Sequence, residues 1–416
     1  MKAIFQVFGS DLVCKVVWGV ANVALVRWMT PNEFSVVTLA IAWQTLLMSG
    51  WCQNLSQLYI IGHQELRLES ESKPFLTLQL AVLGPLLLFV GAWWRPGAQV
   101  FVPFALLVIL STWLEYLRAV LRQRMMFTAY SAIELVRTGV FLAGLTPWFV
   151  DRSLVFSATS VLWLQVLSVA AAILSTGRVL RAATSFGRLR AAGALATTIL
   201  AGRTRYVFGY FAVLAVFLRL DMFLLEVSDT PFQLAVYGAA FRLFGLMAMG
   251  IQTLHVVLLP AFQHAEGIAE IQAVLRQHRR LLALALPALA LAVGSAGWWF
   301  PWIDGGRYPQ AVDVFRVLGC TAGLGIAFSP FVNVVFRYRD YAFLCLLVTS
   351  ITILSVPLGG WLIRDWHAIG AAVWVFTSSS LLNLTIYIRA RCLMRTEVLA
   401  AATAASVDVP YMSRAA

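Results

Sequence analysis

Three charged residues lie inside apolar stretches that are long enough to cross a membrane. Arg219 and Asp221 fall within the run 211–227, and Arg242 lies in the middle of the next run. A charged side chain at the centre of a bilayer costs about 2.5 to 3.5 kcal/mol, so it is kept where a partner or a substrate compensates for it. Such groups can bind an anion, neutralise each other or, in the case of the carboxylate, exchange a coupling ion.

Spacing decides which of these charges can neutralise each other within one helix. Arg219 and Asp221 are about 200° apart around a helix, so they cannot form an intrahelical pair, whereas Arg219 shares a face with Glu226. Asp221 is left for a basic residue of another helix or for a coupling ion. Arg242 has no acidic residue within four positions, and a guanidinium binds phosphate through two parallel hydrogen bonds. We expect Arg242, ahead of Arg219, to bind an anion.

A polar stripe follows one face of the first apolar segment. Asp11, Lys15, Trp18 and Asn22 recur at spacings of four, three and four residues, which places them one above the other on a helix. This face either packs against another helix, with Asp11 and Lys15 neutralising each other, or lines a water-filled cavity. Lys15 is therefore a further candidate anion ligand, and Asp11 a further candidate for ion coupling.

Three other acid–arginine pairs have a spacing of three residues and are expected to form within single helices. They are Glu115 with Arg118, Glu134 with Arg137, and Asp313 with Arg316. We expect the first pair to be solvated near a helix end. Arg137 also counts among the candidate anion ligands.

Amides and aromatic residues gather at the end of the second apolar segment, at Trp51, Gln53, Asn54, Ser56, Gln57 and Tyr59. Amides can bond sugar hydroxyls while aromatic rings cover the apolar faces of a sugar. The same residues also suit helix packing through interhelical hydrogen bonds, which is the favoured interpretation. Four of this cluster are nevertheless candidate sugar contacts: Trp51, Gln53, Asn54 and Gln57.

Membrane-spanning helices must position all these groups. The 416 residues are 61% hydrophobic and 12% charged, more apolar than a soluble core can bury. Apolar runs of about 20 residues, enough to span, lie at 4–29, 34–62, 75–94, 100–121, 129–150, 154–176, 204–227, 232–262, 281–300, 310–336, 341–363 and 368–388. We predict an all-α polytopic membrane protein with about twelve transmembrane helices.

Basic residues are distributed unevenly between the two sides of this topology. Most of the 31 lysines and arginines fall on the side of both termini, whereas the opposite side holds Arg27, Arg95, Arg152, Arg307 and Arg364. The positive-inside rule therefore predicts cytoplasmic N- and C-termini. The net charge of +12 is explained by topology, so we expect no nucleic-acid partner.

The chain repeats itself at an offset of about 200 residues. Thr30-Pro31 after the first span is echoed by Thr230-Pro231 after the seventh, and Trp93-Trp94 at the end of the third span is echoed by Trp298-Trp299 at the end of the ninth. Six spans separate the copies, so the halves form a parallel repeat with a binding site expected between them. The predicted units are a six-helix lobe at 1–176, an amphipathic cytoplasmic linker at 177–203, a six-helix lobe at 204–391 and a cytoplasmic tail at 392–416.

The five cysteines and five histidines have no spacing typical of disulfides or of a metal site, so neither metal nor cofactor is expected.

The connectors are too short to fold a catalytic domain, and we predict that the chain is not an enzyme. An intramembrane polymerase of lipid-linked sugars is a less favoured alternative. It would have to use Asp151, Arg152, Arg364 and Asp365, which are better explained as helix-end anchors.

Several short segments together carry a resemblance to a known family. They are Asp-Met-Phe-Leu-Leu at 221–225, Val-Tyr-Gly-Ala-Ala-Phe-Arg-Leu at 236–243, Leu-Leu-Pro at 258–260, Arg-Trp-Met-Thr-Pro-Asn-Glu-Phe at 27–34, Tyr308 with Ala311, and Ile-Gly-Ala-Ala at 369–372. These segments resemble the polysaccharide-export flippases, the Wzx-type proteins of the multidrug/oligosaccharidyl-lipid/polysaccharide (MOP) superfamily. In related lipid II flippases, a tyrosine-alanine-x-arginine motif places its arginine opposite the pyrophosphate. Tyr237 and Arg242 look similar, with a longer spacing, and Tyr237 joins the candidate sugar contacts.

The resemblance implies two lobes that rock between inward-open and outward-open states. It further implies movement of an undecaprenyl-diphosphate-linked oligosaccharide across the bacterial inner membrane for O-antigen, capsule or exopolysaccharide synthesis. Coupling to H⁺, Na⁺ or membrane potential would involve Asp221 or Asp11. Expected partners are this substrate, membrane lipids, and a polysaccharide polymerase or chain-length regulator. The alternative function is an ion-coupled small-molecule antiporter of the drug-exporting (MATE) branch or of the major facilitator fold.

Overall fold

In the computed structural model, the described residues are 14, 17–19, 21, 23–56, 73–123, 126–151, 156–176, 187, 189–202, 204–264 and 267–407. Every regular element within these ranges is helical. Seven of the helices are long and apolar enough to cross a membrane, or eight if the pair Ile268–Gly294 and Ala296–Asp304, bent by 63°, is one span. The predicted all-α polytopic membrane fold is confirmed. Asp11, Lys15, Asn22 and Gln57 lie outside the described residues.

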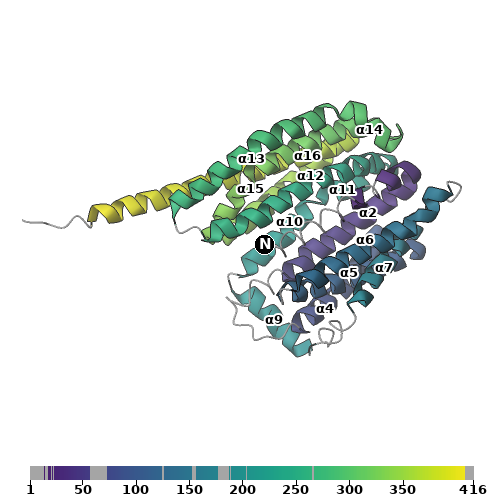
Figure 1. The fold of residues 1–416 in the computed structure, drawn as a ribbon, viewed down its shortest axis with the longest axis horizontal. Coiled ribbons are helices and arrows are strands. Elements are labelled where there is room, and N and C mark those ends of the chain that lie inside the picture. The colour runs from purple at the N-terminus through teal and green to yellow at the C-terminus, as the bar shows by residue number, and fades with distance from the viewer. Residues whose placement is uncertain are drawn as a thin grey trace, which may run out of the picture.

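The helices form two groups that lie side by side (Figure 1). The first contains α2 (Pro31–Leu47), the π-helix η1 (Met48–Gln53), α4 (Lys73–Trp94), α5 (Ala98–Gln123), α6 (Phe127–Val150) and α7 (Ala158–Ser175). The second contains α10 (Thr204–Phe217), α11 (Leu220–Ser228), α12 (Pro231–His264), α13 (Ile268–Gly294), α14 (Ala296–Asp304), α15 (Ala311–Arg337) and α16 (Tyr341–Val407). Helix α9 (Leu189–Ala201) packs Ala192, Leu195 and Ile199 inward and contacts α4.

The sequence repeat is also a repeat of local structure. The Thr30 hydroxyl accepts a hydrogen bond from the Glu33 amide, and the Thr230 hydroxyl accepts one from the Gln233 amide. A threonine cap followed by proline starts a helix well, because proline lacks an amide hydrogen that the first turn could not use. These caps begin α2 and α12, which contact each other where the two groups meet.

The residue three positions after each threonine makes a second equivalent contact. The carboxylate of Glu33 accepts a hydrogen bond from the amide of Ala158, the first residue of α7, at 2.5 Å. The amide oxygen of Gln233 accepts one from the amide of Ala368 in α16, at 3.4 Å. Both side chains thus reach another helix of their own group and satisfy an amide hydrogen where a helical segment starts.

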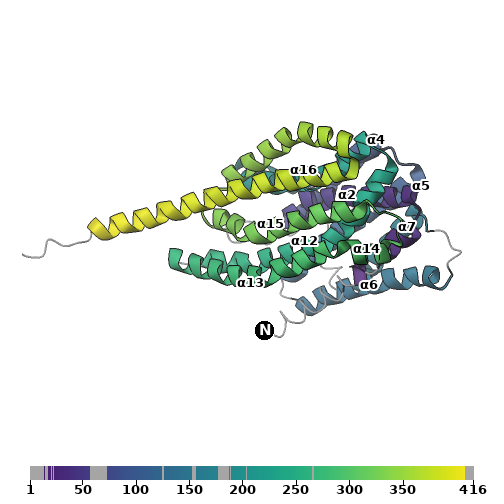
Figure 2. The ribbon, with the colours of Figure 1, turned by 90° about the horizontal axis from the view of Figure 1, so that it is seen from above.

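Helix α16 turns back on itself. His367 has a φ of 52° and a ψ of −133°, so α16 is two helices joined at a kink. The indole of Trp374 donates to the carbonyl of Ser355 at 2.6 Å. A Cβ on Gly370 would lie 2.0 Å from the carbonyl oxygen of Leu362, so only glycine allows this approach. The predicted spans 341–363 and 368–388 are the two arms of this hairpin (Figure 2).

Candidate functional site

The membrane span that carries Arg219 is broken at that residue. Helix α10 ends at Phe217 and α11 begins at Leu220, and Arg219 between them has a φ of −130°. The sequence predicts one continuous helix here, in which Arg219 would share a face with Glu226 and could pair with it. That pairing is not formed, because the seven-residue spacing aligns two side chains only along an unbroken helix. Arg219 instead lies with its guanidinium carbon 4.8 Å from the ring centre of Phe241.

Asp221 is enclosed at the start of α11. Its carboxylate accepts hydrogen bonds from the hydroxyl of Tyr237 and, at 2.8 Å, from the amide of Met222. Asp221 is 1% exposed and Tyr237 is fully buried. A carboxylate in the first turn also suits the positive end of the helix dipole. The hydrogen bond between Asp221 and Tyr237 therefore joins α11 to α12, and the Tyr237 side chain takes part in helix packing.

A cavity of about 350 Å³ lies between the two groups of helices. Three candidate anion ligands line it: Arg137 from the first group, and Arg219 and Arg242 from the second. Glu115 is the one acidic residue among its described lining residues. The amides of Gln44, Gln53 and Gln165 add hydrogen-bonding groups to the wall. The structure thus brings together positive charges and neutral polar groups from distant parts of the sequence.

On the first group's side, a closed ionic cluster backs the cavity. Arg118 lies 2.5 Å from the carboxylate of Glu115 and 3.1 Å from that of Glu134, and it donates to the hydroxyl of Tyr130. Arg137 lies 3.5 Å from the same carboxylate of Glu134. We call these four charged residues the ionic cluster. Two arginines and two carboxylates balance one another, as buried charges must.

The ionic cluster corrects one expectation from the sequence. Glu115 and Arg118 are predicted to be solvated near a helix end, but their side chains are only 13% and 16% exposed. The reason is tertiary, since α5 packs against both α6 and α7. The intrahelical pairs Glu134–Arg137 and Asp313–Arg316 form as predicted, and the latter is exposed.

On the other side of the cavity, arginines rest on aromatic rings. The guanidinium carbon of Arg242 lies 4.4 Å from the ring centre of Phe34, which belongs to the first group of helices. Arg219 makes the equivalent contact with Phe241, as described above. A ring face attracts a cation through its negative quadrupole but leaves the N–H groups at the edge of the guanidinium able to donate.

The polar end of the second span divides between packing and the cavity. The π-helix η1 presents Met48, Ser49 and Gln53 to the cavity. Trp51 donates to the carbonyl of Gln79 at 3.1 Å, and Asn54 donates to the carbonyl of Phe208 at 2.9 Å. Of the candidate sugar contacts in the described chain, Gln53 alone lines the cavity, whereas Trp51, Asn54 and Tyr237 take part in helix packing. A π-helical turn often marks a functional position.

Sequence reasoning did not single out Gln44 and Gln165 as cavity residues. Gln44 donates to the hydroxyl of Ser111 at 3.2 Å, across α2 and α5. Gln165 lies in α7 and is largely buried. The available signal was an amide within an apolar stretch, which needs a polar partner in a membrane.

The two groups of helices also meet at the end of the cavity where α2 and α12 begin. Arg307 donates to the carbonyl of Met29 at 2.9 Å. The ring centre of Tyr308 lies 6.1 Å from the ring centre of Phe34 and 6.1 Å from that of Phe232. Burial raises the pKa of Tyr308 above its usual value. These contacts join the groups at this end.

Comparisons with known proteins reveal similarity in structure and none in sequence. No family model matches the chain, and no curated protein matches it by sequence. A structure described as the lipid II flippase MurJ in an inward closed conformation matches with a TM-score of 0.70 at 7% identity, covering 92% of this chain and 87% of that one. Two MATE transporters also match. One is an inward-facing multidrug resistance MATE transporter of the MOP superfamily, with a TM-score of 0.62, 11% identity, and coverage of 92% and 95%.

The other is the MATE transporter VcmN of Vibrio cholerae, with a TM-score of 0.61, 11% identity, and coverage of 95% and 98%. At these identities the similarity shows the fold. The chain is a multi-pass membrane protein with the all-helical fold of MOP transporters, as the sequence resemblance implied. The similarity to the Wzx-type branch stays a prediction.

Proposed function

We propose that this chain is a flippase for an undecaprenyl-diphosphate-linked oligosaccharide in the bacterial inner membrane. The observation that carries the proposal is the group of three arginines, Arg137, Arg219 and Arg242, on one cavity between two groups of membrane helices. A diphosphate is a compact anion that guanidinium groups bind through paired hydrogen bonds. The MurJ structure is that of a lipid II flippase, and the shared fold adds support to the proposal.

The residues of the cavity suggest a division of roles. Arg242 and Arg219 bind the diphosphate, because both guanidinium groups line the cavity and lie over rings, Phe34 and Phe241, that hold a cation without removing its charge. Arg137 shares its charge with Glu134 and contributes less. Gln44, Gln53 and Gln165 hydrogen-bond sugar hydroxyls. Lys15, from the first span, is a further diphosphate ligand in this proposal.

Alternating access follows from the same arrangement. Contacts of Arg307 with Met29 and of Tyr308 with Phe34 hold the two groups together at the end where α2 and α12 begin. Breaking them while closing the opposite end would expose the cavity on the other side of the membrane. The prenyl chain stays in the lipid between the two groups of helices. Its hydrocarbon is never transferred to water, so this part of the substrate adds no free-energy barrier. No bond is made or broken, so the process needs no catalytic group.

Flipping in proteoliposomes tests the proposal. Purified protein is reconstituted with undecaprenyl diphosphate linked to a fluorescently labelled sugar, and a membrane-impermeant reductant reports the fraction of label that reaches the outer leaflet. We expect wild-type protein to flip the lipid and Arg242→Glu to abolish flipping, because the new carboxylate repels the diphosphate. Arg364→Glu, an exposed position outside the cavity, is the matched control and should flip normally. Equal flipping by wild type and Arg242→Glu would overturn the proposal.

A second candidate function, an ion-coupled small-molecule antiporter, is favoured by one observation. Asp221 is a buried carboxylate in the broken span, beside the cavity residue Arg219. Buried acids in membrane spans can carry coupling protons or sodium ions. An imposed H⁺ or Na⁺ gradient should then drive transport of an organic cation in wild-type liposomes but not in those with Asp221→Asn. Gradient-independent flipping of the lipid by both proteins would reject this candidate.

If the flippase proposal holds, the partners follow from the product. A lipid-linked oligosaccharide on the outer leaflet is the substrate of an enzyme that polymerises or ligates it. A polymerase or a chain-length regulator is therefore a proposed neighbour of this protein in the membrane. Co-purification after mild crosslinking tests this contact.

A further inference from the structure

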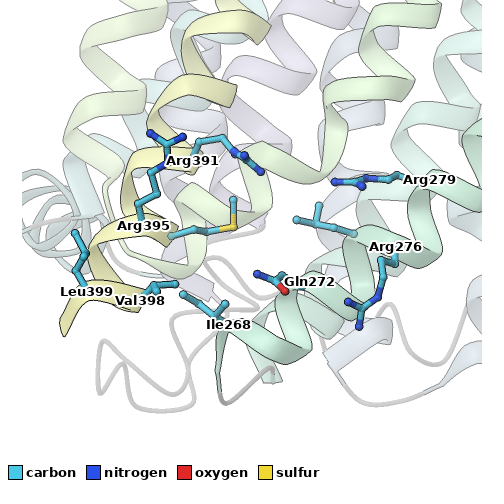
Figure 3. Close-up of a pocket in the computed structure, with 10 residues that line it drawn as sticks. Ile268, Gln272, Arg276, Arg279, Arg391, Arg395, Val398 and Leu399 are labelled. Carbon is cyan, nitrogen blue, oxygen red and sulfur yellow. The ribbon is translucent and has the colours of Figure 1, made fainter. Parts of the chain in front are cut away.

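A second cavity, of about 520 Å³, lies between the start of α13 and the end of α16. It shares no described lining residue with the central cavity. Arg276 and Arg279 enter it from α13, and Arg391 and Arg395 enter it from α16 (Figure 3). We call these four residues and the space between them the arginine groove. It plays no part in the function proposed above.

Within the described residues, no carboxylate neutralises the charge of the arginine groove. None of its four guanidinium groups has a carboxylate partner within the part of the chain that the structure describes, and no acidic residue lines it. Two acids near the α16 side are engaged elsewhere, since Glu397 accepts a hydrogen bond from Tyr338 and Asp340 pairs with Arg389 at 2.7 Å. Glu270, in the first turn of α13, does not line the groove. Four like charges this close repel one another unless an anion lies between them.

The rest of the groove is apolar. Leu275 and Met394 are buried and form its floor, and Ile268, Val398 and Leu399 lie at its rim. A small inorganic anion would use the arginines and leave these apolar surfaces in water. A ligand with an anionic head and hydrocarbon next to it would cover both.

The groove lies where the lipid-facing surface of both helices ends. Along α13, the exposed Leu281 and Leu284 follow directly after the arginines. Along α16, the exposed Leu384 and Ile388 come directly before them. Exposed leucines suit the hydrocarbon layer and arginines suit the headgroup layer, so both helices cross the same boundary at the level of the groove.

We propose that the arginine groove binds the headgroup of an anionic phospholipid from the surrounding bilayer. The guanidinium groups of α13 and α16 hold the phosphate from two sides, and the acyl chains run along the exposed leucines of the two helices. Basic pockets between transmembrane helices fit anionic headgroups in this way. The bound lipid bridges α13 to the extension of α16 and offsets the repulsion among the arginines.

Lipid binding by the purified full-length protein tests this proposal. Native mass spectrometry counts bound phosphatidylglycerol and phosphatidylcholine as each lipid is titrated into detergent-solubilised protein. We expect selective retention of phosphatidylglycerol. The double variant Arg276→Gln/Arg395→Gln should bind it about 25-fold more weakly, at about fivefold for each basic residue removed.

The matched control is Arg280→Gln/Arg364→Gln, which removes the same charge from exposed positions outside the groove. It should change phosphatidylglycerol binding less than twofold. An equal loss in the control, or equal binding of the two lipids by wild type, would overturn the proposal. So would full displacement of the lipid by millimolar inorganic phosphate, since that result indicates a site for a free anion. Loss of flipping with normal lipid binding bears on the flippase proposal alone.

Discussion

The arginines in the two walls of the central cavity differ in their carboxylate partners. In the wall formed by the first group of helices, Arg118 and Arg137 are neutralised by Glu115 and Glu134. In the opposite wall, Arg219 lies on Phe241, and the carboxylate nearest to it in the chain, Asp221, bonds to Tyr237. Arg118 and Arg137 also lie over rings, those of Tyr130 and Trp18, so the carboxylate partners and not the rings distinguish the first wall. Charge that carboxylates balance within the protein stabilises the fold, whereas the charge of Arg219, which pairs with no carboxylate among the described residues, stays suited to a ligand. We infer that the first wall is structural and the second binds substrate.

The largest expected effect comes from unbalancing the first wall. Glu134→Gln removes the carboxylate that bridges Arg118 and Arg137 and leaves positive charge buried, which costs about 3 to 5 kcal/mol. Thermal unfolding of the purified variant in detergent should show a clearly lower midpoint than wild type. Asp313→Asn is the control, because it removes one partner of an exposed pair and should cost at most about 1 kcal/mol. Similar midpoints for the two variants would show that the ionic cluster is not structural.

A smaller loss is expected when the tie between α11 and α12 is removed. Tyr237→Phe leaves the buried carboxylate of Asp221 without its hydroxyl donor, at a cost of about 1 to 3 kcal/mol. The same thermal measurement applies. Tyr206→Phe removes a hydroxyl that is bonded to Arg205 at the surface, so it should leave the midpoint nearly unchanged. If both tyrosines behave alike, Asp221 is not held by this bond and becomes a stronger candidate for ion coupling.

The smallest effect on stability is expected in the second wall. Removing an arginine there should leave stability unchanged or slightly higher, whereas the two changes above should lower it. Arg219→Gln relieves the protein of a charge whose buried Nε has no partner among the described residues, so its unfolding midpoint should equal or slightly exceed that of wild type, by at most about 1 kcal/mol in free energy. Arg118→Gln is the comparison in the first wall and should be destabilising. A large loss of stability in Arg219→Gln would erase the distinction between the walls.

The sequence alone predicts the features that depend on composition and local pattern. The Glu134–Arg137 pair and the membrane class follow from short-range rules and are found. The position of Arg242 on the central cavity follows from a resemblance in helix α12 together with the cost of burying its charge.

Other features depend on contacts between distant segments and could not be predicted. The break at Arg219 involves no proline or glycine, so no local signal marks it. The burial of Glu115 and Arg118 depends on the packing of α5 against α6 and α7. The arginine groove joins residues of α13 and α16 that are more than 100 positions apart in the chain. In each case a tertiary contact overrides the expectation from one helix.

Direct binding of the proposed substrate tests the central claim, that the second wall holds the diphosphate. The measurement is the dissociation constant of an undecaprenyl-diphosphate-linked saccharide for wild type, Arg242→Gln and Arg137→Gln. A charge-assisted contact is worth about 1.5 to 3 kcal/mol, so Arg242→Gln should weaken binding about 10- to 100-fold. Arg137→Gln should weaken it less, because Glu134 already shares that charge. Equal affinities for wild type and Arg242→Gln would contradict the account.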